Sequence, residues 1–95
     1  MALQMNYYYP LLDVTIMNAY WRINPNNGIM GGKGVIHYNI DVFKNSEMAH
    51  VDNPHPIATQ SYLFVPNISD GSLNFIAQAY NHAKSLPYFE GGVDV

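Results

Sequence analysis

The chain has 95 residues, and its four Lys and Arg residues against seven Asp and Glu residues give a net charge of −3 at pH 7. This length builds one domain, residues 1–95, with a single small core. No basic run is present, which argues against a protein that binds nucleic acid by neutralising phosphates. The absence of cysteine excludes disulfides, thiolate metal sites and a thiol nucleophile.

Charged residues make up only 12% of the chain, whereas it contains eight tyrosines. A surface with few charges is desolvated at lower cost and repels its own copies less, so the composition favours lasting protein contacts. The alternative is an ordinary polar surface rich in Asn. No apolar run approaches the length of a membrane span, and the first residues lack the basic region of a signal peptide. We therefore expect no membrane contact.

Residues 1–12 are predicted to form an extended N-terminal arm, because Pro10 pushes the preceding residue toward an extended conformation. Tyr7, Tyr8 and Tyr9 are consecutive, and three consecutive side chains of an extended chain cannot all face one core. We expect at least one of them to be exposed or packed against another subunit. The alternative is an arm that lies along its own domain.

Residues 11–24 are predicted to form a strand, because β-branched and aromatic residues alternate around Trp21. The Asn- and Gly-rich residues 24–34 then form a hairpin connection, and they lack the pattern of a phosphate-binding loop. Residues 35–44 are the clearest strand, with apolar side chains on one face and polar ones on the other. We expect these two strands to pair antiparallel.

The segment after this hairpin begins with residues 45–49, which are predicted to form a turn or a single helical turn. Residues 57–66 return to a strand pattern with apolar side chains on both sides. Such a strand is covered on both faces, or its second face is buried by assembly.

Residues 70–86 are predicted to form an amphipathic helix, because apolar residues recur there at helical intervals. Asp70 or Ser72 is expected to cap its first turn, and Pro87 ends it. Residues 88–95 follow as a short C-terminal tail. The predicted fold class is α+β: a small antiparallel β-sheet of three to four strands packed against one C-terminal α-helix, with the apolar sheet face as the floor for the helix.

Residues able to support chemistry are few and scattered. His50, Asp52 and His55 lie within six residues and are possible metal ligands, but a proline-broken loop gives them no fixed face and polar loop residues are the simpler interpretation. His37 and Asp41 share a strand face without the partners that catalysis needs. We therefore expect no enzyme activity, no cofactor and no metal. Exposed Tyr and Asn residues near residues 24–34 leave a carbohydrate-binding platform as an alternative function.

Several segments in order resemble a recurring group of small proteins: NAYWRI, the Gly-rich turn, VIHYNIDVF, the loop ending in NPHPI, SYLFVPN and the ending FIAQAYNHAKSLPYFEGGVDV. These proteins are encoded among the virion genes of tailed bacteriophages and prophages. The resemblance covers residues 18–95 and is strongest in the ending. It implies a small structural or accessory component of the tail, the baseplate or fibre attachment, or the capsid surface, and it carries over no binding residues.

The sequence thus predicts a non-enzymatic virion protein that acts through protein–protein packing, with other copies of itself and other virion proteins as partners. A carbohydrate- or host-surface-binding module on the particle is the alternative. The residues expected at the protein interface are aromatic: Tyr7, Tyr8, Tyr9, Trp21, Tyr62, Tyr88 and Phe89.

Overall fold

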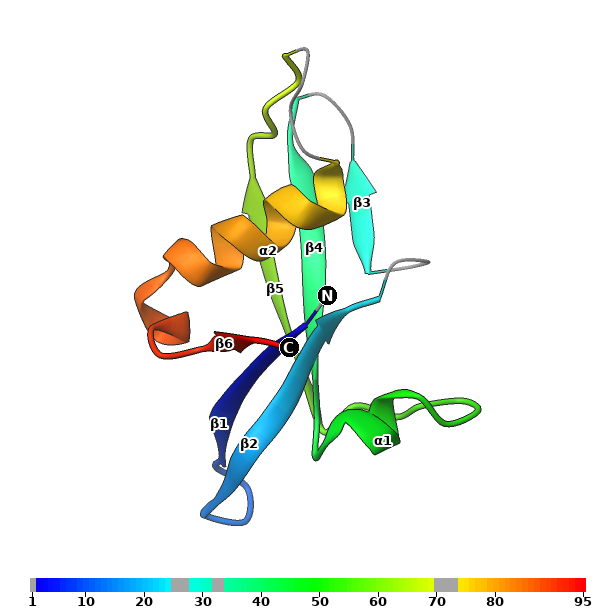
Figure 1. Ribbon diagram of the computed structural model, residues 1–95, viewed down its shortest axis with the longest axis vertical. Helices are drawn as coiled ribbons and strands as arrows, with labels where there is room; N and C mark the ends of the chain where they lie inside the picture. The colour runs from blue at the N-terminus through cyan, green and yellow to red at the C-terminus, as the bar shows by residue number, and fades with distance from the viewer. Residues whose placement is uncertain (1, 25–27, 32–33, 70–73) are drawn as a thin grey trace.

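The computed structural model of the chain describes residues 2–24, 28–31, 34–69 and 74–95 (Figure 1). Its described strands form one six-stranded sheet with antiparallel pairings, and α2 lies across one face. The α+β class agrees with this architecture, although the sheet has more strands than the predicted three to four. The elements are β1 (Leu3–Tyr9), β2 (Val14–Ile23), β3 (Ile29–Gly31), β4 (Ile36–Phe43), α1 (Ser46–Ala49), β5 (Ala58–Phe64), α2 (Phe75–Ser85), the 3₁₀ turn η1 (Pro87–Phe89) and β6 (Val93–Asp94).

Strand β4 is the centre of the sheet. Along one edge it pairs with β5 over its length, from Ile36 opposite Phe64 to Val42 opposite Ala58. Its other edge is shared, because β2 pairs with residues 40–43 and β3 pairs with residues 36–38. The antiparallel pairing predicted between residues 11–24 and 35–44 is therefore confirmed. The turn or helical turn predicted for residues 45–49 is confirmed as well, as α1.

The segments expected to be an arm and a tail belong to the sheet. Residues Leu3–Tyr9 form β1, which pairs antiparallel with β2, so the alternative of an arm lying along its own domain is the correct one. The tail forms η1 and then β6, which pairs with β1 at Leu3 and Gln4. The backbone N–H of Val95 also donates to the carbonyl oxygen of Ala2 at 3.0 Å. These pairings satisfy backbone groups that a free arm and tail leave to water.

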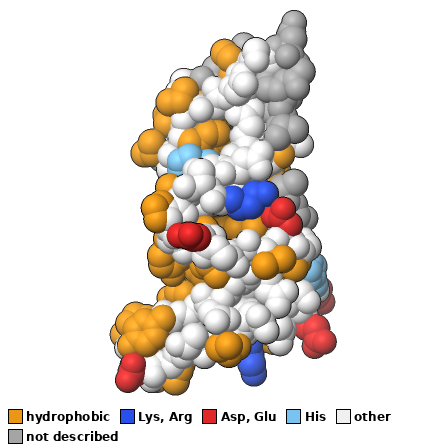
Figure 2. All heavy atoms as spheres, turned by 60° about the vertical axis from the view of Figure 1, so that its left-hand side comes forward, with side chains coloured by type: hydrophobic (Ala, Val, Ile, Leu, Met, Phe, Trp, Pro, Cys, Tyr) orange, Lys and Arg blue, Asp and Glu red, His pale blue; other side chains and the backbone are white. Residues whose placement is uncertain are grey.

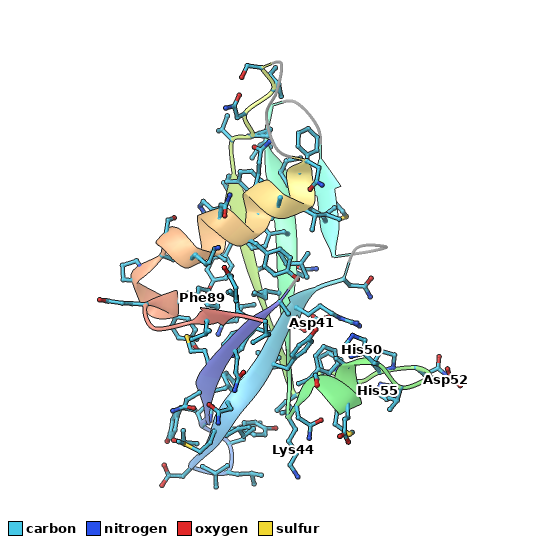
Figure 3. The ribbon with its side chains drawn as sticks, in the orientation of Figure 1. Asp41, Lys44, His50, Asp52, His55 and Phe89 are labelled. Carbon is cyan, nitrogen blue, oxygen red and sulfur yellow. The ribbon has the colours of Figure 1, made fainter. Side chains whose placement is uncertain are left out.

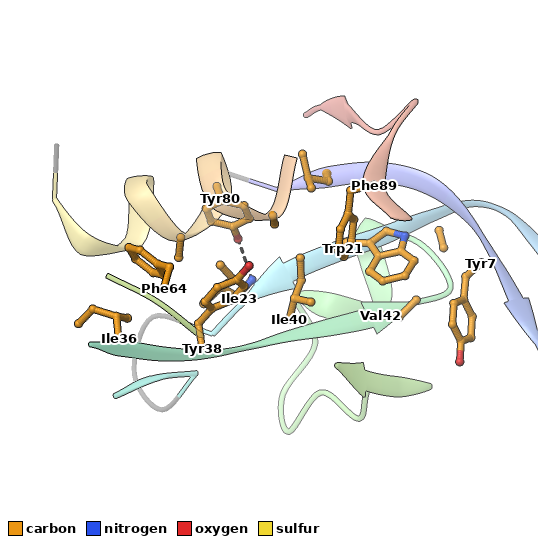
Figure 4. Packing of buried hydrophobic residues seen from close by; sticks show 14 residues of the cluster. Tyr7, Trp21, Ile23, Ile36, Tyr38, Ile40, Val42, Phe64, Tyr80 and Phe89 are labelled. Atoms are coloured by element: carbon orange, nitrogen blue, oxygen red, sulfur yellow. Dashed lines mark hydrogen bonds between the residues drawn. The ribbon is translucent and has the colours of Figure 1, made fainter. Parts of the chain in front are cut away.

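The core lies between the sheet and α2 (Figure 4). Strand β4 contributes alternate residues to it, as the predicted apolar face requires: Ile36, Tyr38, Ile40 and Val42 are each at most 2% exposed. The buried residues of α2 are Ala79, Tyr80 and Ala83, and the two alanines let the helix backbone approach the strands closely. The expected helix on an apolar sheet floor is confirmed.

Helix α2 is shorter than predicted at its start. It begins at Phe75, and the side chain of Asn74 caps it by accepting a hydrogen bond from the backbone N–H of Ala77 at 2.8 Å. The predicted caps Asp70 and Ser72 lie outside the described residues. The end is as predicted, since η1 with Pro87 at its first position follows Ser85 and Leu86.

Candidate interaction surface

Strands β1 and β2 form a hairpin that extends beyond the rest of the sheet (Figure 1). Within the described residues, β2 pairs with β4 only through residues 20–23, whereas it pairs with β1 along nearly its whole length, out to Val14 opposite Tyr9. Two strands alone are marginally stable in water. The far half of this hairpin lies beyond the ladder with β4, and it is held by contacts on one face, where Tyr7 is buried and Tyr9 and Ile16 pack against the core.

A β-bulge lies at the middle of the hairpin. Met5 pairs with Ala19 and Tyr7 pairs with Ile16, so two residues of β2 lie opposite Asn6 alone. One of them, Asn18, has a φ of 54°, and its backbone N–H donates to the side-chain oxygen of Asn6 at 2.8 Å. Such a bulge increases the local twist and bends the strand, which directs the far half of the hairpin away from the sheet.

The turn of the hairpin is fixed by one side-chain bond. The hydroxyl of Tyr8 donates to the carboxylate of Asp13 at 2.6 Å, and Asp13 has a φ of 51°. Only the protonated hydroxyl can donate this bond, so the bond favours the neutral form and raises the pKa of Tyr8 above its ordinary value. Burial makes a smaller contribution in the same direction. Pro10 adds a fixed φ within the same turn. The bond and the fixed φ together restrict the conformations of the turn.

Apolar side chains dominate the surface of this turn and the strand residues beside it. Leu11 is 81% exposed and Leu12 is 69% exposed, which are high values for leucine. Figure 2 shows apolar side chains at the lower end of the molecule, where the hairpin of Figure 1 projects. We call this surface the hairpin tip, and its exposed apolar residues are Tyr8, Leu11, Leu12, Val14 and Met17.

The base of the hairpin is an aromatic cluster rather than a free surface. Trp21 is fully buried, with its ring centre 5.5 Å from that of Tyr7 and 5.2 Å from that of Phe89, both in edge-to-face geometry. Its indole N–H donates to the carbonyl oxygen of Met5 at 2.9 Å. Three of the residues expected at a protein interface are therefore core residues that hold the hairpin on the sheet.

The other expected interface residues differ in exposure. Tyr8 and Tyr88 are about half exposed, at 53% and 51%. Tyr9 and Tyr62 are half-buried against the core, and the hydroxyl of Tyr62 donates to the side chain of Gln60. The structure brings Tyr7, Trp21, Tyr88 and Phe89 into one ring cluster, which Tyr9 joins beside Tyr7 and Tyr62 joins beside Phe89.

Sequence reasoning missed the leucines of the hairpin tip. Leu11 and Leu12 were assigned to the start of a strand, but the structure has them in the turn between β1 and β2. The available signal was their position between Pro10 and Asp13, because this frame is typical of a turn and turn positions favour small or polar residues.

A groove runs along the outer face of the hairpin base. It has a volume of about 840 Å³ and is lined by residues of both hairpin strands, by the start of α1 and by Val95, and Tyr20 and Lys44 lie on its wall. A second hollow of about 800 Å³ separates the hairpin from the segment after η1. Among the described residues, the groove is lined by no acidic or histidine side chain, and the second hollow is lined by Glu90 as its one acidic residue.

The possible metal ligands lie apart from these hollows. His50, Asp52 and His55 are all exposed and follow one another from the C-cap of α1 into the loop after it, with Asp52 at the outer end (Figure 3). The ring of His50 bonds through Nδ1 with the carbonyl oxygen of Ser46 at 2.7 Å. No group of three His, Cys, Asp or Glu side chains arranged to hold a metal occurs among the described residues.

The remaining histidines have structural surroundings. His37 is exposed on β4, as expected. His82 is more than a helix-end residue, because its Nδ1 lies 2.7 Å from the hydroxyl of Tyr38 and its ring stacks on Phe64 with 5.4 Å between ring centres. The loop considered for carbohydrate binding contains residues 25–27 and 32–33, which lie outside the described residues.

Comparisons with protein-family models, with curated proteins and with solved structures found no match. Within the described part of the chain, no helix is long and apolar enough to cross a membrane.

Proposed function

We propose that this protein is a non-enzymatic structural component of a tailed-phage virion, located in the tail, the baseplate or fibre attachment, or the capsid surface. It acts through protein–protein packing. The observation that carries the packing function is the hairpin tip, an ordered turn whose surface is apolar. The assignment to a phage particle is supported by the resemblance of residues 18–95 to small virion proteins.

The leucines of the hairpin tip do little for the fold. At 81% and 69% exposure, Leu11 and Leu12 leave most of their surface in water, although a polar residue at either turn position would cost less to hydrate. Several exposed apolar side chains on one turn and its flanking strands favour a contact site for another protein. Burying one leucine side chain stabilises a complex by about 1.5–3 kcal/mol.

The hairpin tip is also prepared for binding at low entropic cost. The bond between Tyr8 and Asp13 fixes the turn, and the bulge at Asn18 sets the direction of the hairpin. A loop that is already in its bound conformation loses less conformational entropy on association, so more of the burial energy appears as affinity. The buried Trp21 at the base gives the hairpin a rigid support.

The proposed partner surface is an apolar socket on a neighbouring virion protein. The hairpin tip offers only Asp13 as a charged group, and this carboxylate already accepts a bond from Tyr8. A strongly charged surface on the neighbouring protein would lose its hydration without finding an opposite charge on the hairpin tip, so an apolar surface is the better match. Many copies in a ring or lattice would turn a modest contact into a large combined affinity.

The genes beside the coding gene and the protein content of purified particles test the phage assignment. We expect flanking genes for tail or capsid proteins and recovery of this chain from particles by mass spectrometry. Flanking genes of host metabolism, or particles that lack the chain, would refute the assignment.

Incorporation of variants into particles tests the packing function. The double variant Leu11→Asn with Leu12→Asn is expected to weaken the contact by about a hundredfold or more, because two leucines together contribute about 3 kcal/mol or more. The matched control is Met48→Asn with Val51→Asn, which changes two exposed apolar residues near α1. Equal incorporation of both double variants would refute a packing role for the hairpin tip.

A further inference from the structure

Strand β5 has an open edge. Among the described residues it pairs with β4 alone, and Figure 1 shows no strand on its outer side. In a strand, alternate residues direct their backbone N–H and C=O groups to opposite edges. About half of the residues in Ala58–Phe64 therefore present unpaired backbone groups outward, where another strand can bind them.

This edge lacks the features by which proteins usually protect an open edge. The seven residues ATQSYLF contain no charged residue and no proline. The nearest prolines, Pro56 and Pro66, lie outside the strand. The pairing of β5 with β4 is continuous and shows no bulge. By contrast, the ladder of β1 is interrupted at Asn6 by the bulge in β2, and β3 and β6 are only three and two residues long.

The side chains beside the edge prepare β5 for pairing rather than block it. The hydroxyl of Thr59 donates to Asp41 at 2.8 Å and that of Ser61 donates to Asn39 at 2.7 Å, so both side chains bond toward β4 and away from the free edge. Leu63 on the same face is 55% exposed. A strand added to β5 would cover part of this leucine.

We propose that the outer edge of β5 pairs antiparallel with the β5 edge of a second copy of this chain about a two-fold axis, so that the sheet continues across two molecules. This inference deepens the packing function above, on which it rests for its purpose. In a two-fold interface each residue meets a residue of the same surface. A strand without charge is suited to this, because like charges opposite one another destabilise a strand pair.

The symmetry makes a sharp geometric prediction. Hydrogen-bonded and non-hydrogen-bonded residue pairs alternate along an antiparallel ladder. The two halves of a symmetric ladder are equivalent only if one residue of β5 lies opposite its own copy. The Cα atoms of such a pair lie about 4.5–5.5 Å apart, which is within the range that a disulfide bridges.

Cysteine scanning tests this geometry, and the cysteine-free chain needs no prior substitution. After oxidation, we expect disulfide-linked dimers to peak at one position of β5 and to decline on both sides of it. Cross-linking that is uniform along β5, or no greater than that of the control Ser85→Cys at the end of α2, would overturn the proposal. The variants are Thr59→Cys, Gln60→Cys, Ser61→Cys, Tyr62→Cys and Leu63→Cys.

Sedimentation of the full chain over a wide range of concentration provides the second test. We expect a monomer–dimer equilibrium whose Kd rises at least about tenfold in Leu63→Lys, which brings two like charges to the interface. The matched control Met48→Lys makes the same kind of substitution at an exposed apolar residue of α1, outside both proposed contact surfaces, and should leave Kd unchanged. A wild-type chain that stays monomeric throughout, or a dimer that Leu63→Lys leaves intact, would overturn the proposal.

The two proposals fail separately. A monomeric wild-type chain whose incorporation into particles still depends on Leu11 and Leu12 would refute pairing through β5 and leave the packing function standing. A dimer that depends on Leu63, in a chain whose incorporation is insensitive to the hairpin tip, would refute the packing role of the hairpin tip and leave pairing through β5 standing.

Discussion

The hydroxyl of Tyr80 bonds α2 to β2, and removing it should destabilise the fold. It accepts a hydrogen bond from the backbone N–H of Ile23 at 2.7 Å, and both residues are only 2% exposed (Figure 4). Tyr80→Phe keeps the ring and its packing but leaves this N–H buried without an acceptor. A buried donor without a partner costs about 1–3 kcal/mol.

The expected loss of about 2 kcal/mol is a large part of the stability of a small domain. In a chain of this length it lowers Tm by roughly 10 °C. The measurement is urea denaturation of the wild type and the variant, followed by the fluorescence of Trp21 and repeated by thermal unfolding. If the free energy of unfolding keeps the same slope against urea concentration while the urea midpoint falls, the loss of stability belongs to the native state.

The control Tyr38→Phe removes the same atom from a second buried tyrosine. Its hydroxyl bonds with Nδ1 of His82, which belongs to a half-buried side chain that water reaches more easily. We expect a loss of about 1 kcal/mol or less, because the imidazole recovers a partner from solvent. If Tyr80→Phe proved neutral, or if Tyr38→Phe cost more, the reasoning from the buried N–H of Ile23 would be wrong.

Three further predictions concern the surface, the tyrosines and the helix cap. Leu11→Asn with Leu12→Asn should leave the free energy of unfolding within about 0.5 kcal/mol of the wild type, since exposed side chains contribute little; a large loss in urea denaturation would mean that these leucines serve the fold. Burial raises the pKa of Tyr38 and Tyr80 above the ordinary 10.0, so their protonated forms are favoured in the native state. Stability should therefore be complete below pH 10 and fall above it by up to about 1.4 kcal/mol per pH unit for each tyrosine; denaturation midpoints that stay constant across pH 10 would contradict this. Asn74→Ala should cost about 1 kcal/mol through loss of the helix cap, measured by thermal unfolding, and no loss would show that this cap is dispensable.

Periodicity alone determined the elements that have one apolar face. The alternation through Ile36, Tyr38, Ile40 and Val42 predicted β4, and the helical spacing through Ala79 and Ala83 predicted α2. Both elements bury one regular face, so the pattern of side chains reports the conformation directly. The α+β class follows from these two elements, because each needs the other to cover its apolar face.

Only the tertiary structure decided the role of the ends of the chain. Nothing local distinguishes an extended arm from a strand, since both have the same backbone, and pairing of Tyr7 with Ile16 depends on residues nine positions away. The buried positions of Trp21 and Phe89 have the same origin. An aromatic residue is as suited to a core as to an interface, and here the core contacts come from β1, β2 and η1 together.

The two proposed contact surfaces also needed the assembled sheet. Leu11 and Leu12 are ordinary apolar residues in the sequence. They become a projecting surface because β2 extends well beyond the residues that pair with β4. The open edge of β5 exists because β2 and β3 share the opposite edge of β4. Local spacing reports which face of a segment is apolar, but which edges and tips stay open is set by long-range pairing, and that depends on every strand at once.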